Sequence, residues 1–184
     1  MFNTELPIDL NYSKSILEVD GNISDDEMIQ ISIGQGKAQI TPMHMNMITC
    51  AIANDGVLMK PRFMNRILSA NGSIIKTYPN ETYGQLLSKE ESDVLTELMV
   101  GVVNEGTATK LKSDMYQAAG KTGSAEYNGV KEDSHAWFTG FAPAEDPEVA
   151  VTIIIEGIGS GGDYAAPIAK RIFDAYFAKN PLSE

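Results

Sequence analysis

The last part of the chain places three strand-length apolar segments in succession and follows them with one amphipathic segment. The strand-like segments lie at about 118–127, 135–142 and 148–156. The connections between them are short, which favours an antiparallel sheet, because parallel strands need crossovers of a dozen or more residues. The segment from about 164 to 178 predicts a helix, and its expected buried stripe consists of Ala169, Ile172, Phe173 and Tyr176. The expected fold class is therefore α+β, an antiparallel sheet of three C-terminal strands packed with helices.

Earlier segments carry clear start and stop signals. Thr41 and Pro42 suit the N-cap and first position of a helix that should end at Asn54-Asp55-Gly56. Ser88 and Glu91 form a capping box for a second helix, which should end near Gly106. Between these helices, 63–68 and 74–78 flank a turn at 70–73 and predict a hairpin. Residues 1–30 show little periodicity, and we expect an irregular polar segment there.

Composition limits the classes of function. The chain has 184 residues, 25 Asp and Glu against 14 Lys and Arg, and a net charge of −11. Nucleic-acid binding needs a basic footprint, so this balance argues against it. The lone Cys50 excludes an intramolecular disulfide, and we expect it to be buried as a small apolar side chain. No apolar run approaches the roughly 20 residues that cross a bilayer, so any anchor would lie outside these residues.

The segment Lys121-Thr122-Gly123-Ser124 carries the chemistry. Side chains alternate along a strand, so Lys121 and Gly123 share one face while Thr122 and Ser124 share the other. Gly123 lets a ligand backbone approach closely. A cation, two hydroxyls and strand N–H groups together suit an anionic peptide end or a developing oxyanion.

The surrounding motifs identify a family. Lys-Thr-Gly is the third motif of penicillin-binding proteins and class A β-lactamases, after S-x-x-K and S-D-N. In order along the chain, the accompanying motifs are Gly34-Gln35-Gly36, Ile40-Thr41-Pro42, Ala53-Asn54-Asp55-Gly56, Gly106-Thr107-Ala108 and 136–143. Over roughly residues 31–178 the chain resembles the downstream part of class B penicillin-binding protein transpeptidase domains, with the β-lactamase/transpeptidase-like fold.

The resemblance implies roles for the matching residues. Lys121 would tune proton transfer near a nucleophilic serine, and Thr122 and Ser124 would hold the terminal carboxylate of a D-Ala-D-Ala stem peptide or a β-lactam. The N–H of Ser124 would form half of an oxyanion hole, with Gly123 and Trp137 beside the substrate. His135 would be structural. The resemblance implies no cofactor or metal, and a location on the extracytoplasmic face of the bacterial cell membrane.

The other two motifs of the family, S-x-x-K and S-x-N, do not occur in this sequence on a predicted helix or in the order that the family has. Ser73-Ile74-Ile75-Lys76 and Ser69-Ala70-Asn71 match S-x-x-K and S-x-N literally, but they fall in the predicted hairpin and in reversed order. We therefore expect residues 1–184 to be the C-terminal part of one transpeptidase domain that lacks its nucleophile and is inactive alone.

The resemblance also implies a sheet of five antiparallel strands, two of which come from the start of the domain and would be missing from residues 1–184. The strand at 149–155 would then offer an apolar edge for self-association, unless the last helix covers it.

Alternatives remain open at this point. A β-lactam sensor of the same fold, a serine β-lactamase and a catalytically dead homologue would all share these residues. The segment 157–162 also fits G-x-G-x-x-G, but no second parallel strand follows it, so a plain loop is expected rather than a dinucleotide site.

Overall fold

The computed structural model describes residues 1–19, 21–126 and 134–182. The helices are α1 (Asp25–Ser32), α2 (Pro42–Ile52), α3 (Lys89–Asn104) and α4 (Ala165–Phe177), with a 3-10 turn at Thr109–Leu111. The short strands are β1 (Ile16–Leu17), β2 (Ala38–Gln39), β3 (Val57–Met59), β4 (Arg66–Leu68), β5 (Ile74–Thr77) and β6 (Thr82–Gln85). The long strands are β7 (Ala119–Ala125), β8 (His135–Ala142) and β9 (Val149–Ile155).

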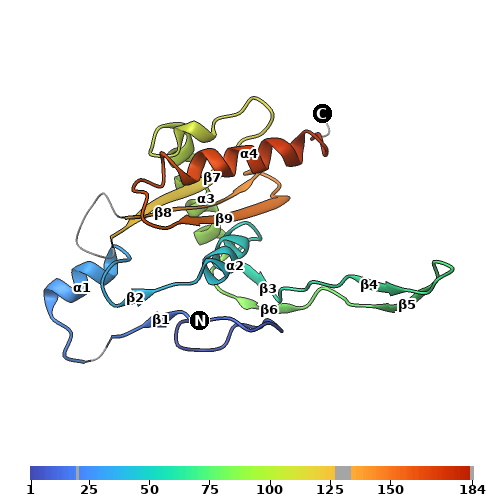
Figure 1. Cartoon of the computed structure of the whole chain (residues 1–184), viewed down its shortest axis with the longest axis horizontal. Coiled ribbons are helices and arrows are strands. Elements are labelled where there is room, and N and C mark those ends of the chain that lie inside the picture. Colours follow the sequence, from blue (N-terminus) through green and yellow to red (C-terminus); the bar gives the residue numbers. More distant parts are fainter. Residues whose placement is uncertain (20, 127–133, 183–184) are drawn as a thin grey trace.

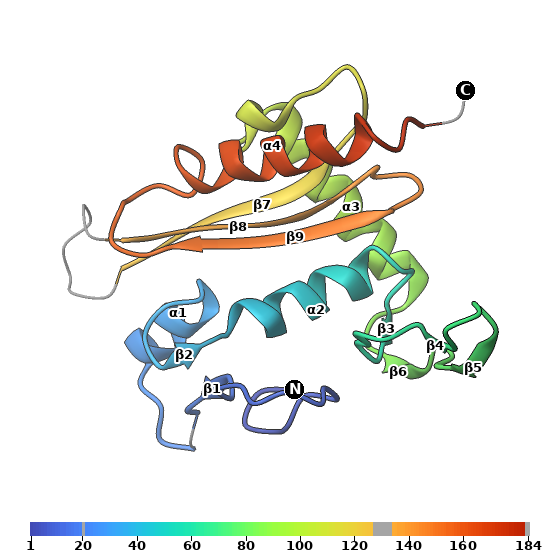
Figure 2. The ribbon, with the colours of Figure 1, turned by 45° about the vertical axis from the view of Figure 1, so that its right-hand side comes forward.

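The three long strands form one antiparallel sheet in the order β7-β8-β9. Figure 2 shows the sheet between two layers, with α4 over one face and α2 below the other. This arrangement confirms the α+β prediction and places each expected strand within a few residues of its observed bounds. Because β7 and β9 are the outer strands, each has an edge that is not paired within this sheet.

The main core lies between the sheet and α4. Phe138 of β8 and Phe173 of α4 are completely buried there, together with Ala169. Gly120 and Gly140 leave room for the Phe138 ring, because a Cβ on either glycine would lie within 2.7 Å of that ring. Burying one such aromatic side chain stabilises the fold by about 1.5–3 kcal/mol. The predicted stripe of α4 is wrong at Ile172, which is 40% exposed because it lies away from the sheet.

Helix α2 contacts the opposite face of the sheet through polar groups. The hydroxyl of Thr49 lies 2.5 Å from that of Thr139 on β8, which in turn lies 2.7 Å from that of Thr152 on β9. The start of the helix is as predicted, with Thr41 as N-cap accepting from the N–H of His44. Asp55 and Gly56 then reverse the chain with positive φ angles of 52° and 80°.

Two expectations for the rest of the chain are corrected, and one pair of strands was not expected. Residues 25–32 form α1, because Ser24 and Glu27 make a capping box; the helix buries no residue, so it has no apolar stripe to reveal it. Cys50 is exposed rather than buried, since it lies on the outer side of α2. Strands β3 and β6, which the sequence did not indicate, pair with each other.

The predicted hairpin forms from β4 and β5, with its turn at Gly72. It extends from the β3–β6 pair as a projecting ribbon, far from the three-stranded sheet (Figure 1). We call residues 61–80 the arm.

Among the described residues, no helix is both long and apolar enough to traverse a bilayer.

Candidate active site

The Lys-Thr-Gly-Ser segment lies on β7, at the edge of the sheet. Lys121 and Ser124 are exposed, Gly123 is partly exposed, and Thr122 is only 8% exposed. Lys121 pairs across the sheet with Thr139, and Gly123 pairs with Trp137, so these residues share the α2 face. Thr122 pairs with the buried Phe138, which places Thr122 and Ser124 on the α4 face.

Two contacts show which backbone groups lie at the outer edge of β7. The ammonium of Lys121 donates to the carbonyl of Thr122 at 2.6 Å, and the side-chain amide of Gln35 donates to the carbonyl of Ser124 at 3.3 Å. Both donors lie outside the sheet. In an extended strand the N–H and C=O of one residue point to the same side. The N–H groups of Thr122 and Ser124 therefore point outward, away from β8.

Thr122 is held by a residue from the preceding turn. Its hydroxyl lies 2.5 Å from the hydroxyl of Thr107, which follows the end of α3. The carbonyl of Thr107 packs in turn against Gly162, where a Cβ would lie only 2.4 Å from that oxygen. The turn at 106–108 thus fixes the side chain of Thr122 from one side and contacts the loop after β9 on the other.

The glycine-rich loop after β9 lies directly on the Lys-Thr-Gly-Ser strand. The N–H of Gly161 donates to the hydroxyl of Ser124 at 3.4 Å. A Cβ on Gly161 would lie 2.2 Å from the carbonyl oxygen of Trp137 and 2.4 Å from that of Gly123. The loop leads into the last helix, and no strand follows it among residues 156–182, so it is the plain loop that the sequence predicted.

His135 and Trp137 take separate roles at the start of β8. The Nδ1 atom of His135 accepts from the N–H of Gly157 at 3.1 Å, which ties the loop after β9 to the sheet. Trp137 is half-buried and stands on the α2 face, beside the bare backbone of Gly123. The hydrogen bond of His135 is consistent with the structural role that we expect for it, and Trp137 lies across the sheet from Gly123.

The literal S-x-x-K and S-x-N matches are confirmed as parts of the hairpin. The N–H of Ser69 donates to the carbonyl of Ser73 at 2.9 Å, and Asn71 accepts from the N–H of Ser73. Both motifs lie in the arm, far from β7 in Figure 1. The structure does not bring Ser73 or Lys76 to the Lys-Thr-Gly-Ser segment.

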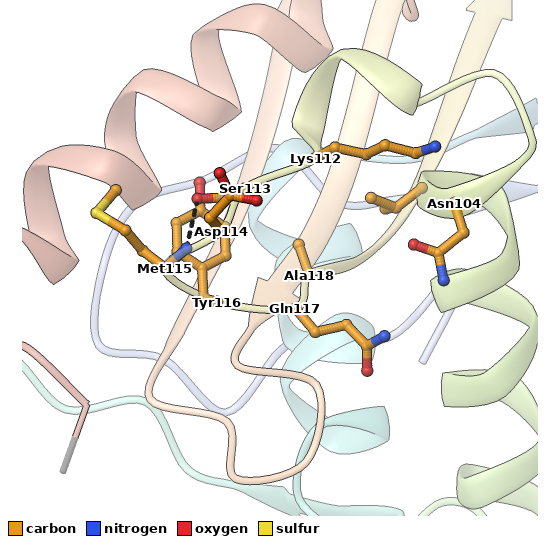
Figure 3. Close-up of a pocket in the computed structure, with 9 residues that line it drawn as sticks. Asn104, Lys112, Ser113, Asp114, Met115, Tyr116, Gln117 and Ala118 are labelled. Atoms are coloured by element: carbon orange, nitrogen blue, oxygen red, sulfur yellow. Dashed lines mark hydrogen bonds between the residues drawn. The ribbon is translucent and has the colours of Figure 1, made fainter. Parts of the chain in front are cut away.

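A hollow of about 620 Å³ lies beside the connection that leads into β7. Figure 3 shows it between the end of α3 and residues 112–118. The phenol of Tyr116 donates to Asp174 of α4 at 2.7 Å, and burial with this hydrogen bond raises the pKa of the Tyr116 phenol. None of residues 121–124 lines the hollow, so it is a feature of the connection and not of the candidate site.

Comparison with known proteins supplies the family. Residues 8–174 match the penicillin binding protein transpeptidase domain. The chain belongs to this family. The transpeptidase domain aligns with class B members: the peptidoglycan D,D-transpeptidase MrdA of Acinetobacter baumannii is 31% identical over 172 residues, covering 85% of this chain and 25% of that protein. The peptidoglycan D,D-transpeptidase PbpA of Mycolicibacterium smegmatis is 35% identical over 151 residues, covering 78% of this chain and 30% of that protein.

Solved structures agree with the fold. Penicillin-binding protein A from M. tuberculosis, in its ceftriaxone acyl-enzyme complex, superposes with a TM-score of 0.83 at 28% identity over 95% of this chain and 40% of that one. The D,D-transpeptidase domain of a peptidoglycan glycosyltransferase from Eggerthella lenta gives a TM-score of 0.78 at 27% identity over 97% and 45%. The chain spans only about a quarter to a third of the length of the two curated relatives.

Three residues at the site were not assigned roles from the sequence. Gln35 and Thr107 stand in motifs that the resemblance used, Gly34-Gln35-Gly36 and Gly106-Thr107-Ala108, but their spacing from β7 says nothing about contact. Gly161 lies in the segment 157–162, for which the sequence predicts only a plain loop. Each of them reaches β7 from a distant part of the chain, so only the folded structure reveals the contact.

Proposed function

We propose that the chain is the C-terminal part of a peptidoglycan D,D-transpeptidase domain, and that β7 forms one wall of its acyl-transfer site. The whole protein would cross-link stem peptides that end in D-Ala-D-Ala through an acyl-enzyme, and β-lactams would react at the same site. The nucleophilic serine would come from a part of the domain outside these residues. The site would work on the extracytoplasmic face of the bacterial cell membrane.

The outer edge of β7 is the observation that carries this proposal. It presents the outward N–H groups of Thr122 and Ser124, together with the exposed hydroxyl of Ser124 and the ammonium of Lys121. An extended peptide can lie along such an edge and bond to its backbone. A carbonyl oxygen placed at the N–H of Ser124 would gain a donor for its developing negative charge.

Each side chain then has a role that its position supports. Lys121 would favour proton transfer at the nucleophile, because its ammonium already lies at the outer edge. Ser124 would bind the substrate carboxylate with its exposed hydroxyl, and Thr122 would add a second hydroxyl whose orientation Thr107 fixes. Gly123 would admit the substrate backbone next to Trp137. Mutational losses of two to four powers of ten are usual for such acid–base and oxyanion groups.

The names of the relatives support a transpeptidase over the alternatives. MrdA and PbpA are both peptidoglycan D,D-transpeptidases, and neither name is that of a β-lactam sensor or a β-lactamase. These observations favour acyl transfer to a peptide as the function of the whole protein.

The gene region upstream of Met1 tests the proposal. We expect it to encode S-x-x-K followed by S-x-N, and we expect the full gene product to be labelled by a fluorescent penicillin. Lys121→Ala should slow labelling by about a hundredfold or more. Lys89→Ala is the control, because Lys89 only pairs with Asp55 and Asp93 on the surface. Labelling of Lys121→Ala at the wild-type rate would rule out the proposed role of Lys121.

The outer edge of β9 is proposed as a second contact surface. Helices α2 and α4 pack against the faces of the sheet, and α4 lies over one face and not beside the outer edge of β9 (Figure 2). Every residue of β9 is partly exposed. We propose that the remainder of the domain pairs with this edge, and that the 184-residue chain alone uses it to pair with a second copy.

Sedimentation velocity tests the pairing of β9 edges. We expect the wild-type chain to associate as its concentration rises, and Ile154→Lys to shift it at least tenfold toward monomer, because a charge on an edge strand opposes pairing. Ile172→Lys places the same charge on an exposed position of α4 and should leave association unchanged. A wild-type chain that stays monomeric at all concentrations would refute the proposal.

A further inference from the structure

The arm has an unusual surface for a segment of an acidic protein. Six of its large apolar side chains are 39–66% exposed, namely Phe63, Met64, Ile67, Leu68, Ile74 and Ile75. No residue from 61 to 80 is buried. Strands β4 and β5 pair only with each other, and an isolated two-stranded hairpin is at best marginally stable in water. The arm therefore exposes apolar surface that its own fold does not cover.

The charge of the arm is opposite to that of the rest of the chain. Residues 61–80 contain Arg62, Arg66 and Lys76 and have no Asp or Glu, whereas the whole chain has a net charge of −11. Lys76 lies over the ring of Tyr78, with 4.4 Å from its ammonium nitrogen to the ring centroid. Arg62 donates to the carbonyl of Tyr78, a neutral partner. The three cations thus lack a carboxylate within the arm and can attract an anionic surface.

Both faces of the ribbon carry this mixture. Arg66 pairs with Thr77 and Ile67 pairs with Lys76, and successive pairs of a ladder lie on opposite faces. Arg66 and Lys76 therefore lie on opposite faces. Ile67 and Leu68 are consecutive residues of β4, so their side chains alternate, although the register with β5 shifts between them. One rigid protein surface would cover only one of these faces. A fluid layer of lipid headgroups can surround the ribbon on all sides, and it demands no complementary shape.

The arm is long enough to separate its cations from the negative charge of the rest of the chain. Each leg has about ten residues, and at about 3.3 Å per residue it reaches about 30 Å. Salt screens charges over about 8 Å at physiological ionic strength. Figure 1 shows the arm pointing away from the three-stranded sheet and its helices. An anionic surface at the end of the arm would therefore attract its cations with little repulsion from the acidic remainder.

We propose that the arm binds the surface of a lipid bilayer that contains anionic headgroups. Basic side chains would bind the headgroups, and the exposed Phe, Met, Leu and Ile side chains would enter the boundary between headgroups and acyl chains. The arm contains none of residues 121–124, so this binding is independent of the proposed transpeptidase function. It would give the domain a fixed contact with the membrane surface in addition to any covalent anchor.

Co-sedimentation of the 184-residue chain with vesicles tests the proposal. We expect the chain to pellet with vesicles of equal phosphatidylcholine and phosphatidylglycerol at physiological salt, and to stay in solution with phosphatidylcholine alone. Arg66→Gln with Lys76→Gln should weaken binding at least tenfold, because it removes two of three cations. Ile74→Ser with Ile75→Ser should weaken it similarly by removing the apolar contact.

Matched variants outside the arm distinguish vesicle binding by the arm from nonspecific binding by the rest of the chain. Lys14→Gln with Lys110→Gln removes two exposed cations, and Val94→Ser with Leu98→Ser removes two apolar side chains that are 56% and 62% exposed on α3. Both controls should bind as the wild type does. Vesicles should also protect the arm from trypsin, which cuts after Arg and Lys.

Three results would overturn the proposal. The first is equal binding of the arm variants and the wild type to anionic vesicles. The second is binding that does not depend on phosphatidylglycerol. The third is no binding at all, which would point instead to an acidic protein as the partner. Unchanged melting temperatures in the arm variants would show that the fold is intact, as expected for substitutions at exposed positions.

Discussion

Penicillin G added to the 184-residue chain is expected to leave the mass of the protein unchanged. Acylation requires a serine activated by a nearby base, and in S-x-x-K the lysine must lie one helical turn from the serine. The one S-x-x-K sequence in the chain is Ser73-Ile74-Ile75-Lys76, which runs from the turn into β5. Residues three apart in a strand point to opposite faces. Loss of the nucleophile lowers the rate of a serine hydrolase by about 10⁶-fold, so no adduct should accumulate.

Intact-mass analysis gives a direct reading of this result. Penicillin-binding protein A from M. tuberculosis forms a penicillin G acyl-enzyme complex and serves as the positive control. An adduct on the 184-residue chain would contradict the proposed division of the domain. Peptide mapping would then show whether Ser124 or Ser73 carries it, and an adduct on Ser73 would make the arm catalytic.

Gly161→Ala is expected to have the largest effect of any single methyl group added near the site. The new Cβ would lie 2.2 Å from the carbonyl oxygen of Trp137 and 2.4 Å from that of Gly123. Both are backbone atoms of paired strands, so they cannot rotate away. Either the loop after β9 lifts from β7, or the β7–β8 pair separates. We expect a loss of about 3 kcal/mol in the free energy of unfolding, and a fall of about 10 °C in melting temperature.

The same substitution in α3 provides the control. Gly101 is exposed within the helix, and a Cβ there would meet no atom within 4 Å. Gly101→Ala should therefore stabilise the chain by up to about 1 kcal/mol, because alanine is the better helix former. Thermal unfolding followed by circular dichroism compares the two variants. Equal melting temperatures would show that the loop yields without strain.

These two experiments test different parts of the proposed acyl-transfer site. The first asks whether the chain contains a nucleophile, and the second asks whether the wall at β7 depends on the loop that covers it. If both results are as expected, the site is rigid and incomplete in the 184-residue chain. The remainder of the domain would then bring a serine to a wall that is already formed, which is favourable because a preorganised donor costs no reorganisation during the reaction.

Local signals in the sequence predicted most of the elements. The Thr41-Pro42 start of α2 and the capping box of α3 rest on hydrogen bonds within a few residues, so nearby residues suffice to predict them. The same kind of signal, Ser24 with Glu27, precedes α1, but a helix without a buried stripe has no periodicity to confirm it. Strands β3 and β6 are short, and they exist because each pairs with the other across the base of the arm.

For the Lys-Thr-Gly-Ser segment, too, the local sequence predicts some features and only the folded chain decides the others. By itself the sequence determined that Lys121 and Ser124 lie on opposite faces of a strand, because side chains alternate with a period of two. It also determined the family, through an ordered set of motifs. Only the tertiary structure decided that Thr122 is bound by Thr107, that Gln35 reaches the carbonyl of Ser124, and that Gly161 packs on Gly123. Those contacts join residues 15 to 89 positions apart, and packing of the whole chain, which no local pattern records, brings them together.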